Sequence, residues 1–152
     1  MLVYRVGNAA YAKDLTGEGA RLFGGRWNHI GTPCLYTASS RALAVLEYSV
    51  NVNLALILRN LAVSTIEIPD DDIHILSIAS LPGDWKDAPA PASTKDFGTQ
   101  LLNKMQHLAI RIPSTVISEE FNYLINPRHT RINECKVIDV KDFVYDLRIK
   151  VQ

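Results

Sequence analysis

Short apolar and β-branched runs, each bounded by glycine, proline or charged residues, recur along the chain and predict β-strands. The expected strands cover residues 2–6, 33–37, 62–68, 73–78, 108–112, 135–140 and 143–149, and residues 114–118 are expected to continue extended. Two longer segments instead carry apolar residues at helical spacing. Many short strands with two helices favour an α+β fold with an antiparallel or mixed sheet over a doubly wound fold.

The first helix is predicted to begin after Ser39 or Ser40, either of which can cap it, and to run to about Val52. The residues expected to face the core are Ala42, Leu43, Leu46 and Val50. The second helix is predicted to follow the cap-like residues 93–96 and to end near Gln106.

Two stretches predict loops. Residues 7–25 contain few large apolar residues and several glycines, and a loop of this length in a small domain tends to be functional. Residues 81–92 contain three prolines and a glycine and predict an exposed loop. The chain shows no internal repeat and no linker, so we expect one domain covering residues 1–152.

Composition and charge narrow the functional classes. Sixteen basic residues balance sixteen acidic ones, so we expect no direct nucleic-acid binding by this chain. Cys34 and Cys135 lack metal-type spacing and indicate buried thiols in a reducing compartment. No apolar run is long enough to span a membrane, and residues 1–5 resemble a strand rather than a signal peptide, so a cytoplasmic location is expected.

The most informative stretch is Gly-Gly-Arg-Trp-Asn at residues 24–28. Its glycines let the backbone approach a bulky group, and the Arg26 guanidinium suits a phosphate or carboxylate. Trp27 and Asn28 beside it are further candidates for ligand contact. A surface arginine paired with a carboxylate is the commoner fate, and Arg5 and Arg21 are rival anion binders.

Tyr36 and Glu47 extend this candidate site. The Tyr36 ring could stack on a flat heterocycle, although a core tyrosine with a satisfied hydroxyl is an equal alternative. Glu47 borders the apolar stripe of the first helix, where a carboxylate needs a partner or a function. A fixed anion there would stabilise the positive charge that builds on ribose during glycosidic C–N cleavage. The alternatives are an ordinary helix-border glutamate or a partner for Arg41.

Ser114 follows a proline, which is typical of a turn, but its hydroxyl could also contact a carboxamide or ribose. No G-x-S-x-G elbow marks it as a nucleophile. The four histidines show no pair at metal-ligand spacing, so no metal is expected. His129 is either a solvated loop residue or a polar neighbour of the site. The Rossmann and P-loop glycine motifs are absent, so those modes of nucleotide binding are unsupported.

Taken together, these motifs resemble the RES-domain proteins, toxins of RES–Xre type II toxin–antitoxin modules. The matching segments are residues 4–5, 24–28, 31–37, 42–47, 112–114, 122–127 and 145–148. The resemblance covers nearly the whole chain, and the 24–28 and 122–127 blocks are specific in combination.

The resemblance implies a compact α+β fold with a split sheet around an NAD cleft, similar to ADP-ribosyltransferase toxins. It implies NAD+ as substrate, cleaved at the nicotinamide–ribose bond by hydrolysis or phosphorolysis. Some members instead transfer ADP-ribose to a protein. By motif position the family arginine, tyrosine, glutamate and serine fall on Arg26, Tyr36, Glu47 and Ser114.

The resemblance also implies a partner, an Xre-like antitoxin that covers the cleft. Self-association within such a complex is a further expectation, because the apolar stretch at residues 54–61 suits either a core or an interface. A non-catalytic partner-binding module that keeps the fold is the alternative of a different class, and the presence of all four motif residues argues against it.

Overall fold

The computed structural model describes residues 1–53, 55 and 59–150. The strands are β1 (Leu2–Asn8), β2 (Leu35–Ala38), β3 (Leu61–Glu67), β4 (Ile73–Ile75), β5 (Ala109–Pro113), β6 (Phe121–Ile125) and β7 (Lys136–Phe143). The α-helices are α1 (Glu18–Phe23), α2 (Arg41–Asn51) and α3 (Ala92–Lys104), and short 3-10 turns cover Ala9–Tyr11, Ile78–Ser80, Ile132–Glu134 and Leu147–Ile149. Residues 54 and 56–58 of the predicted 54–61 interface stretch lie outside the described residues.

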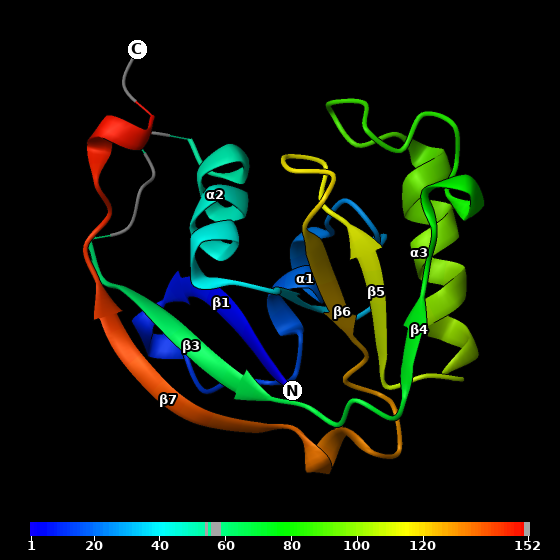
Figure 1. Cartoon of the computed structure of the whole chain (residues 1–152), viewed down its shortest axis with the longest axis horizontal. Helices are drawn as coiled ribbons and strands as arrows, with labels where there is room; N and C mark the ends of the chain where they lie inside the picture. Colours follow the sequence, from blue (N-terminus) through cyan, green and yellow to red (C-terminus); the bar gives the residue numbers. More distant parts are fainter. Residues whose placement is uncertain (54, 56–58, 151–152) are drawn as a thin grey trace.

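The strands form a mixed sheet in the order β4-β5-β6-β2-β1-β3-β7. The β4–β5 pair is parallel, and the other neighbouring pairs are antiparallel. The halves of the sheet meet where Tyr4 of β1 lies opposite Ala38 of β2, whereas β1 and β3 pair along seven residues. Figure 1 shows β1, β3 and β7 diverging from β5 and β6 across this joint. The expected α+β fold with a split mixed sheet is therefore confirmed.

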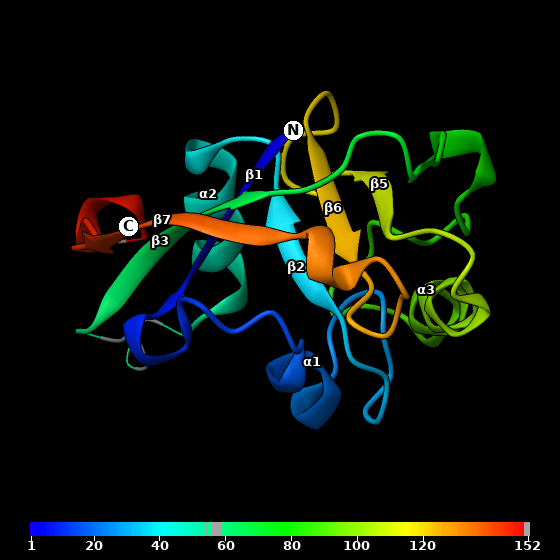
Figure 2. The same cartoon turned by 90° about the horizontal axis from the view of Figure 1, so that it is seen from below.

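Helices cover the two halves of the sheet in different ways. Leu43 and Ala44 of α2 pack with Ala38, Tyr4 and Val6, so α2 lies over the joint between the halves. The helix α3 packs instead on the β4–β6 half, through a cluster that includes Trp27, Trp85, Leu102 and Ile112. Figure 2, seen from below, shows α2 and α3 on opposite sides of the central strands.

The first predicted helix is confirmed at its start and corrected on its buried face. The Ser40 hydroxyl accepts a hydrogen bond from the Leu43 amide (3.1 Å), as expected of an N-cap. Ala42 is exposed, however, and Val50 is 59% exposed. The helix packs on the sheet through Leu43 and Ala44 near its start, and the buried residue of its later turns is Ser49.

Several predicted boundaries were wrong. Residues 7–25 contain a 3-10 turn and α1 rather than one loop, and residues 114–118 turn rather than extend. Residues 135–149 form the single strand β7 followed by a 3-10 turn. The 81–92 segment is only partly exposed, because Leu81 and Trp85 are buried in the α3 cluster.

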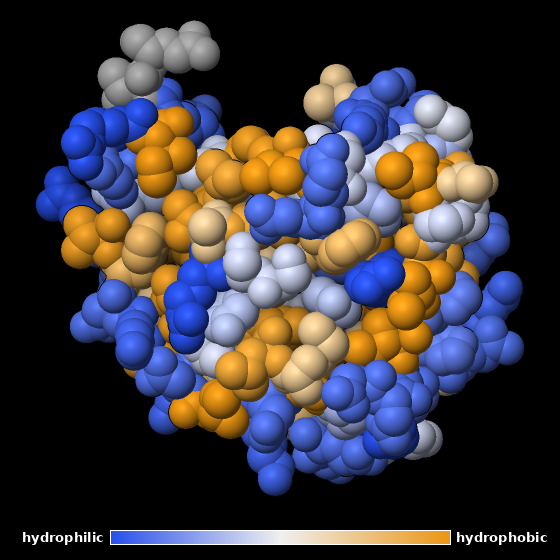
Figure 3. Space-filling model, in the orientation of Figure 1, coloured by the Kyte–Doolittle hydropathy of each residue, from blue (hydrophilic) through white to orange (hydrophobic). Residues whose placement is uncertain are grey.

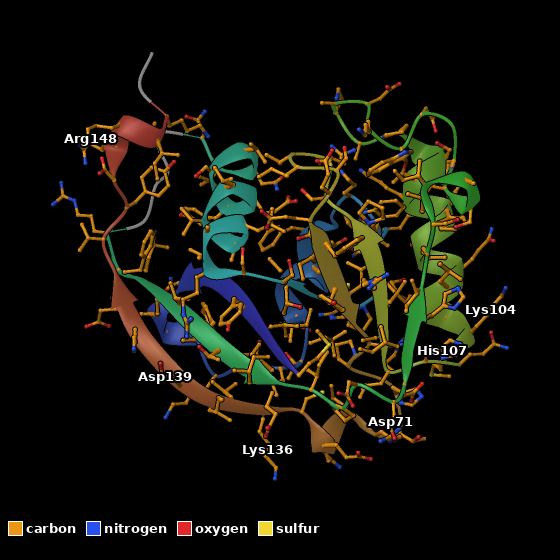
Figure 4. All side chains as sticks on the ribbon, in the orientation of Figure 1. Asp71, Lys104, His107, Lys136, Asp139 and Arg148 are labelled. Atoms are coloured by element: carbon orange, nitrogen blue, oxygen red, sulfur yellow. The ribbon has the colours of Figure 1, made fainter. Side chains whose placement is uncertain are left out.

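No helix among the described residues is long and apolar enough to cross a membrane. Polar and charged side chains dominate the outline of the molecule, and apolar ones gather toward the middle of the face in Figure 3. Charged residues such as Lys104, Lys136 and Asp139 point outward from the rim (Figure 4). These charged side chains lie at the surface, away from the cavity described below.

Candidate active site

A cavity of about 440 Å³ opens between α1, α2 and the joint of the sheet. Its walls combine apolar side chains with three charged ones, Arg5, Arg26 and Glu47. The other lining residues are Tyr4, Val6, Gly19, Ala20, Gly24, Gly25, Trp27, Tyr36, Thr37, Ala38, Ala44, Tyr48, Asn51, Ile112, Pro113, Thr115 and Asn122. Its size and mixed lining suit a small anionic ligand.

The 24–28 block is a tight turn that forms one wall of this cavity. Gly24 ends α1 in a left-handed conformation (φ 71°), which glycine adopts without strain. The Gly25 amide donates to the Asn28 carbonyl (3.1 Å) and closes the turn. A Cβ on Gly25 would lie 2.5 Å from the Tyr36 hydroxyl oxygen and 2.8 Å from Asn28 Oδ1. The second glycine is therefore required by close packing rather than by its dihedral angles.

Asn28 organises the turn from inside. Its side chain is fully buried, and Nδ2 donates to the carbonyls of Ala20 (2.8 Å) and Thr32 (2.9 Å). Its Oδ1 accepts from the Tyr36 hydroxyl (2.6 Å). Asn28 does not line the cavity, so the structure places this candidate ligand contact behind the wall.

Tyr36 presents its ring to the cavity while its hydroxyl belongs to the turn. The hydroxyl oxygen accepts from the Trp27 amide (2.9 Å) and donates its hydrogen to Asn28. Burial raises the pKa of Tyr36 well above its usual range, so the phenol stays neutral. Trp27 also lines the cavity but is only 3% exposed, and its ring packs on Trp85 and Phe97 with centroids 6.3 Å apart in both pairs.

Arg26 lies at the corner of the same turn. Its Nη1 donates to the carbonyls of Trp85 (3.0 Å) and Asp87 (2.8 Å), which ties the 81–92 segment to the turn. No carboxylate pairs with it in the described part of the chain. The structure therefore does not support a surface arginine neutralised by an acidic partner.

Of the two rival arginines, Arg5 lines the cavity and Arg21 does not. Arg5 lines the cavity from β1 and donates through Nη1 to the Asp14 carbonyl (2.9 Å). Desolvation lowers the pKa of Arg5, and the charge of Asp14 opposes this shift. Arg21 instead forms a bidentate pair with Glu18 at an exposed site and does not line the cavity. Arg5 and Arg26 are thus the cationic groups at the cavity.

Glu47 of α2 lines the same cavity as Arg5 and Arg26, and residues from a distant segment donate hydrogen bonds to it. Its Oε1 accepts from the Ser114 hydroxyl (2.7 Å) and from Asn122 Nδ2 (2.6 Å). Ser114 is fully buried, and its Oγ accepts from the amides of Val116 (3.0 Å) and Ile117 (3.2 Å). Because those amides occupy the oxygen's acceptor positions, its hydrogen is directed at Glu47. Ser114 does not line the cavity itself.

Asn122 was missed in the sequence. It sits in the run Phe121–Ile125, which forms β6 and pairs with both β2 and β5. An asparagine inside an otherwise apolar central strand is a signal of a polar partner across the sheet, since an unpaired buried amide is costly. The sequence could not show that the partner is Glu47, 75 residues earlier.

His129 lies away from the cavity. Its ring is nearly buried, with Nε2 3.7 Å from Asp72 Oδ2, and Asp72 also approaches His107 and Arg131. It is therefore neither a solvated loop residue nor a neighbour of the site. Within residues 1–53, 55 and 59–150, no three His, Cys, Asp or Glu side chains are grouped to hold a metal ion.

Comparison with known proteins agrees with this geometry. The model of the RES domain family matches residues 2–147. A "Toxin Res" from Yersinia enterocolitica is 39% identical over 152 residues, covering 99% of this chain and 100% of that toxin. A "Prs ADP-ribosylating toxin" from a Sphingobium species is 38% identical over 141 residues, covering 91% of this chain and 88% of that toxin.

A solved structure shares the fold. A chain in the crystal structure of the M. tuberculosis MbcT–MbcA toxin–antitoxin complex superposes with a TM-score of 0.76 at 21% identity, over 94% of this chain and 84% of that one. The family match and the near full-length relatives agree over the same residues that build the cavity. This chain belongs to the RES-domain family of toxins.

Proposed function

We propose that this protein is the toxin of a type II toxin–antitoxin module and that it cleaves the nicotinamide–ribose bond of NAD+. The observation that carries the proposal is a carboxylate, Glu47, fixed by two neutral hydrogen-bond donors in a cavity that also holds two arginines. NAD+ carries a pyrophosphate, which the arginines can bind. It also develops positive charge on its ribose as the bond breaks, which the carboxylate can stabilise.

The arginines bind the pyrophosphate in this proposal. Arg5 and Arg26 both line the cavity, and each spends part of its guanidinium on backbone carbonyls. Those bonds fix the orientation of the planar groups, and the N–H donors that have no partner among the described residues can meet phosphate oxygens. The Tyr36 ring packs on the nicotinamide–ribose end, and Trp27 and Asn28 shape the turn that places Tyr36.

Glu47 stabilises the transition state. As the C1″–N bond breaks, its electron pair neutralises the pyridinium, nicotinamide leaves, and positive charge appears on the ribose. Both hydrogen bonds to Glu47 reach Oε1, so in the described residues Oε2 remains available to the ribose. Ser114 acts through Glu47 as a positioning residue. The acceptor, water or phosphate, then adds an oxygen to C1″ and releases a proton.

The test is NAD+ consumption by the purified protein, with and without inorganic phosphate, and with products resolved by mass. ADP-ribose regardless of phosphate identifies hydrolysis, and ADP-ribose-1″-phosphate that appears only with phosphate identifies phosphorolysis. Glu47→Gln keeps the size of the side chain and an oxygen that can accept from Ser114 and Asn122, but it removes the negative charge. It should therefore abolish turnover. The exposed Arg21→Gln serves as the control. An active Glu47→Gln enzyme would refute the assignment.

A second candidate is transfer of ADP-ribose to a cellular protein. It is favoured by the relative named a Prs ADP-ribosylating toxin, which is 38% identical to this chain. The same cavity serves both reactions, and only the acceptor differs. Labelled NAD+ incubated with a cell lysate separates them, since label retained in a protein band supports transfer and label only in small molecules opposes it.

The partner in this proposal is an Xre-like antitoxin that covers the cavity. Its support is the structural neighbour, which was solved in a toxin–antitoxin complex. Co-expression with the gene beside it should give a stable complex that no longer consumes NAD+. Size and mass of that complex would also decide whether two copies of this chain pair within it.

A further inference from the structure

The C-terminal segment, residues 144–150, contacts the C-terminal half of α2 through Tyr48 and Ser49. Tyr145 is 8% exposed, whereas its neighbour Val144 is 89% exposed, so the segment turns one aromatic side chain inward. The Tyr145 hydroxyl donates to Ser49 Oγ (2.8 Å), and its ring lies 6.0 Å from that of Tyr48. Figure 1 shows the red segment after β7 returning beside α2, and Figure 2 agrees.

Among the described residues, the apolar cluster that anchors α2 to the sheet includes no residue of the helix's C-terminal half. One face of the helix lines the cavity. This face consists of residues at helical spacing, namely Ala44, Glu47, Tyr48 and Asn51. The apolar anchors Leu43 and Ala44 belong to its first turns. Ser49 is the buried residue of the later turns, and at about 100° per residue it points about 200° away from Glu47.

The same segment also caps the end of α2. The Lys150 ammonium donates to the carbonyls of Ser49 (2.5 Å) and Val52. A cation at the C-terminus of a helix satisfies its last carbonyls and opposes the negative end of its dipole. Ser49 Oγ meanwhile donates to the Val45 carbonyl (2.7 Å), so its hydrogen is committed and it can only accept from Tyr145.

We propose that Tyr145 is a positioning residue, which with Lys150 braces the second half of α2 so that Glu47 meets the bound ribose. The role in catalysis rests on the proposed function, whereas the brace itself does not. Arg5 and Arg26 stand on β1 and on the 24–28 turn, outside the braced helix. Loss of the brace should therefore affect the chemical step more than substrate binding.

The first measurement is the kinetics of NAD+ consumption. Tyr145→Ala should lower kcat about tenfold or more, with KM changed less than about threefold, because a shifted carboxylate loses transition-state contacts. Tyr145→Phe keeps the ring and should rescue most of kcat. The exposed neighbour supplies the control, and Val144→Ala should match the parent enzyme.

The second measurement, amide hydrogen exchange, does not depend on activity. Tyr145→Ala and Lys150→Ala should speed exchange in peptides covering residues 45–51 and leave β5 and β6 unchanged. If the parent protein consumes no NAD+ but exchange in α2 still rises, the proposed function fails and the brace stands. Unchanged exchange in α2 overturns the brace, as does a fall in kcat that accompanies unfolding of the whole protein. Should Tyr145→Ala not fold, Lys150→Ala decides the question through exchange in residues 45–51.

Discussion

Glu47 owes its position to two neutral neighbours rather than to a cation. Ser114 and Asn122 both donate to the same oxygen, so among the described residues neither arginine of the cavity is engaged by this carboxylate. An ion pair with Arg41, the alternative considered from sequence, is absent among the described residues, where Arg41 instead stacks over Tyr4 (4.5 Å). The cavity thus combines the Glu47 carboxylate, held by two neutral donors, with two arginines that have no carboxylate partner among the described residues.

Removing the Ser114 hydroxyl tests this arrangement. Ser114→Ala should lower kcat for NAD+ about tenfold to a hundredfold with little change in KM, because Glu47 loses a donor that fixes it. It should also cost about 1–3 kcal/mol of unfolding free energy, since the partly buried amides of Val116 and Ile117 lose their acceptor. Steady-state kinetics and denaturant unfolding measure both, with the exposed Ser80→Ala as control. Full activity in Ser114→Ala would count against a positioning role.

The two cavity arginines should behave alike and differ from the third. Arg5→Gln and Arg26→Gln should each raise KM for NAD+ about tenfold or more, because a charged hydrogen bond to phosphate is worth about 1.5–3 kcal/mol. Arg21→Gln should leave KM unchanged, since its guanidinium is paired with Glu18 on the surface. An effect confined to Arg26 would assign the whole pyrophosphate to one side chain.

Among the elements, the 24–28 turn does most to shape the cavity. It is pressed between Tyr36 on one side and α3 on the other, where a Cβ on Gly98 would overlap the Trp27 backbone. Gly25 and Gly98, from distant segments, therefore permit close packing on the two sides of the turn. The turn carries Arg26 and positions Tyr36, so its packing decides the geometry of two cavity groups at once.

Adding one methyl group to the turn tests this packing. Gly25→Ala should lower the free energy of unfolding by about 1–3 kcal/mol, because the new Cβ meets the Tyr36 hydroxyl and Asn28. Gly83→Ala is the matched control, since a Cβ at that position meets nothing within 4 Å. Thermal unfolding compares the two. Equal stability of both variants would show that Tyr36 and Asn28 can shift to accept the added methyl group at little cost.

Local patterns predicted the elements better than the site. The cap at Ser40 and the apolar runs of β1 and β3 were legible because each depends on residues close in sequence. The helix α1 was missed because it spans only Glu18–Phe23 and includes a glycine. The contacts of Glu47 with Ser114 and Asn122 cross 67 and 75 residues, and periodicity carries no information about such pairings.

At the scale of the whole molecule, the cavity exists because the sheet is split. Only the start of β1 and the end of β2 meet at the joint, and α2 spans it through Leu43 and Ala44. Charged residues remain at the rim, as the labelled side chains of Figure 4 show. A continuous sheet would have filled the space that the arginines and Glu47 now line.

The interior should also protect both thiols. Cys34 is 2% and Cys135 5% exposed, and desolvation raises the pKa of Cys135 to about 11 and that of Cys34 further. The reactive thiolate is therefore scarce at pH 8. A thiol reagent should label the native protein slowly and both cysteines at once in denaturant. As pH rises above 9, the unfolded thiols ionise first, so these groups should lower stability in alkali.

The order of the strands has a consequence for synthesis. Glu47 emerges from the ribosome early, whereas Ser114, Asn122 and the Tyr145 brace lie in the last third of the chain. The edge strand β7, which precedes the brace, pairs with β3, whose residues lie 69 to 82 positions earlier in the chain. A nascent chain thus carries its carboxylate without the groups that aim it. On the proposed function, a nascent chain should therefore be unable to turn over NAD+ until Ser114, Asn122 and Tyr145 have folded against α2.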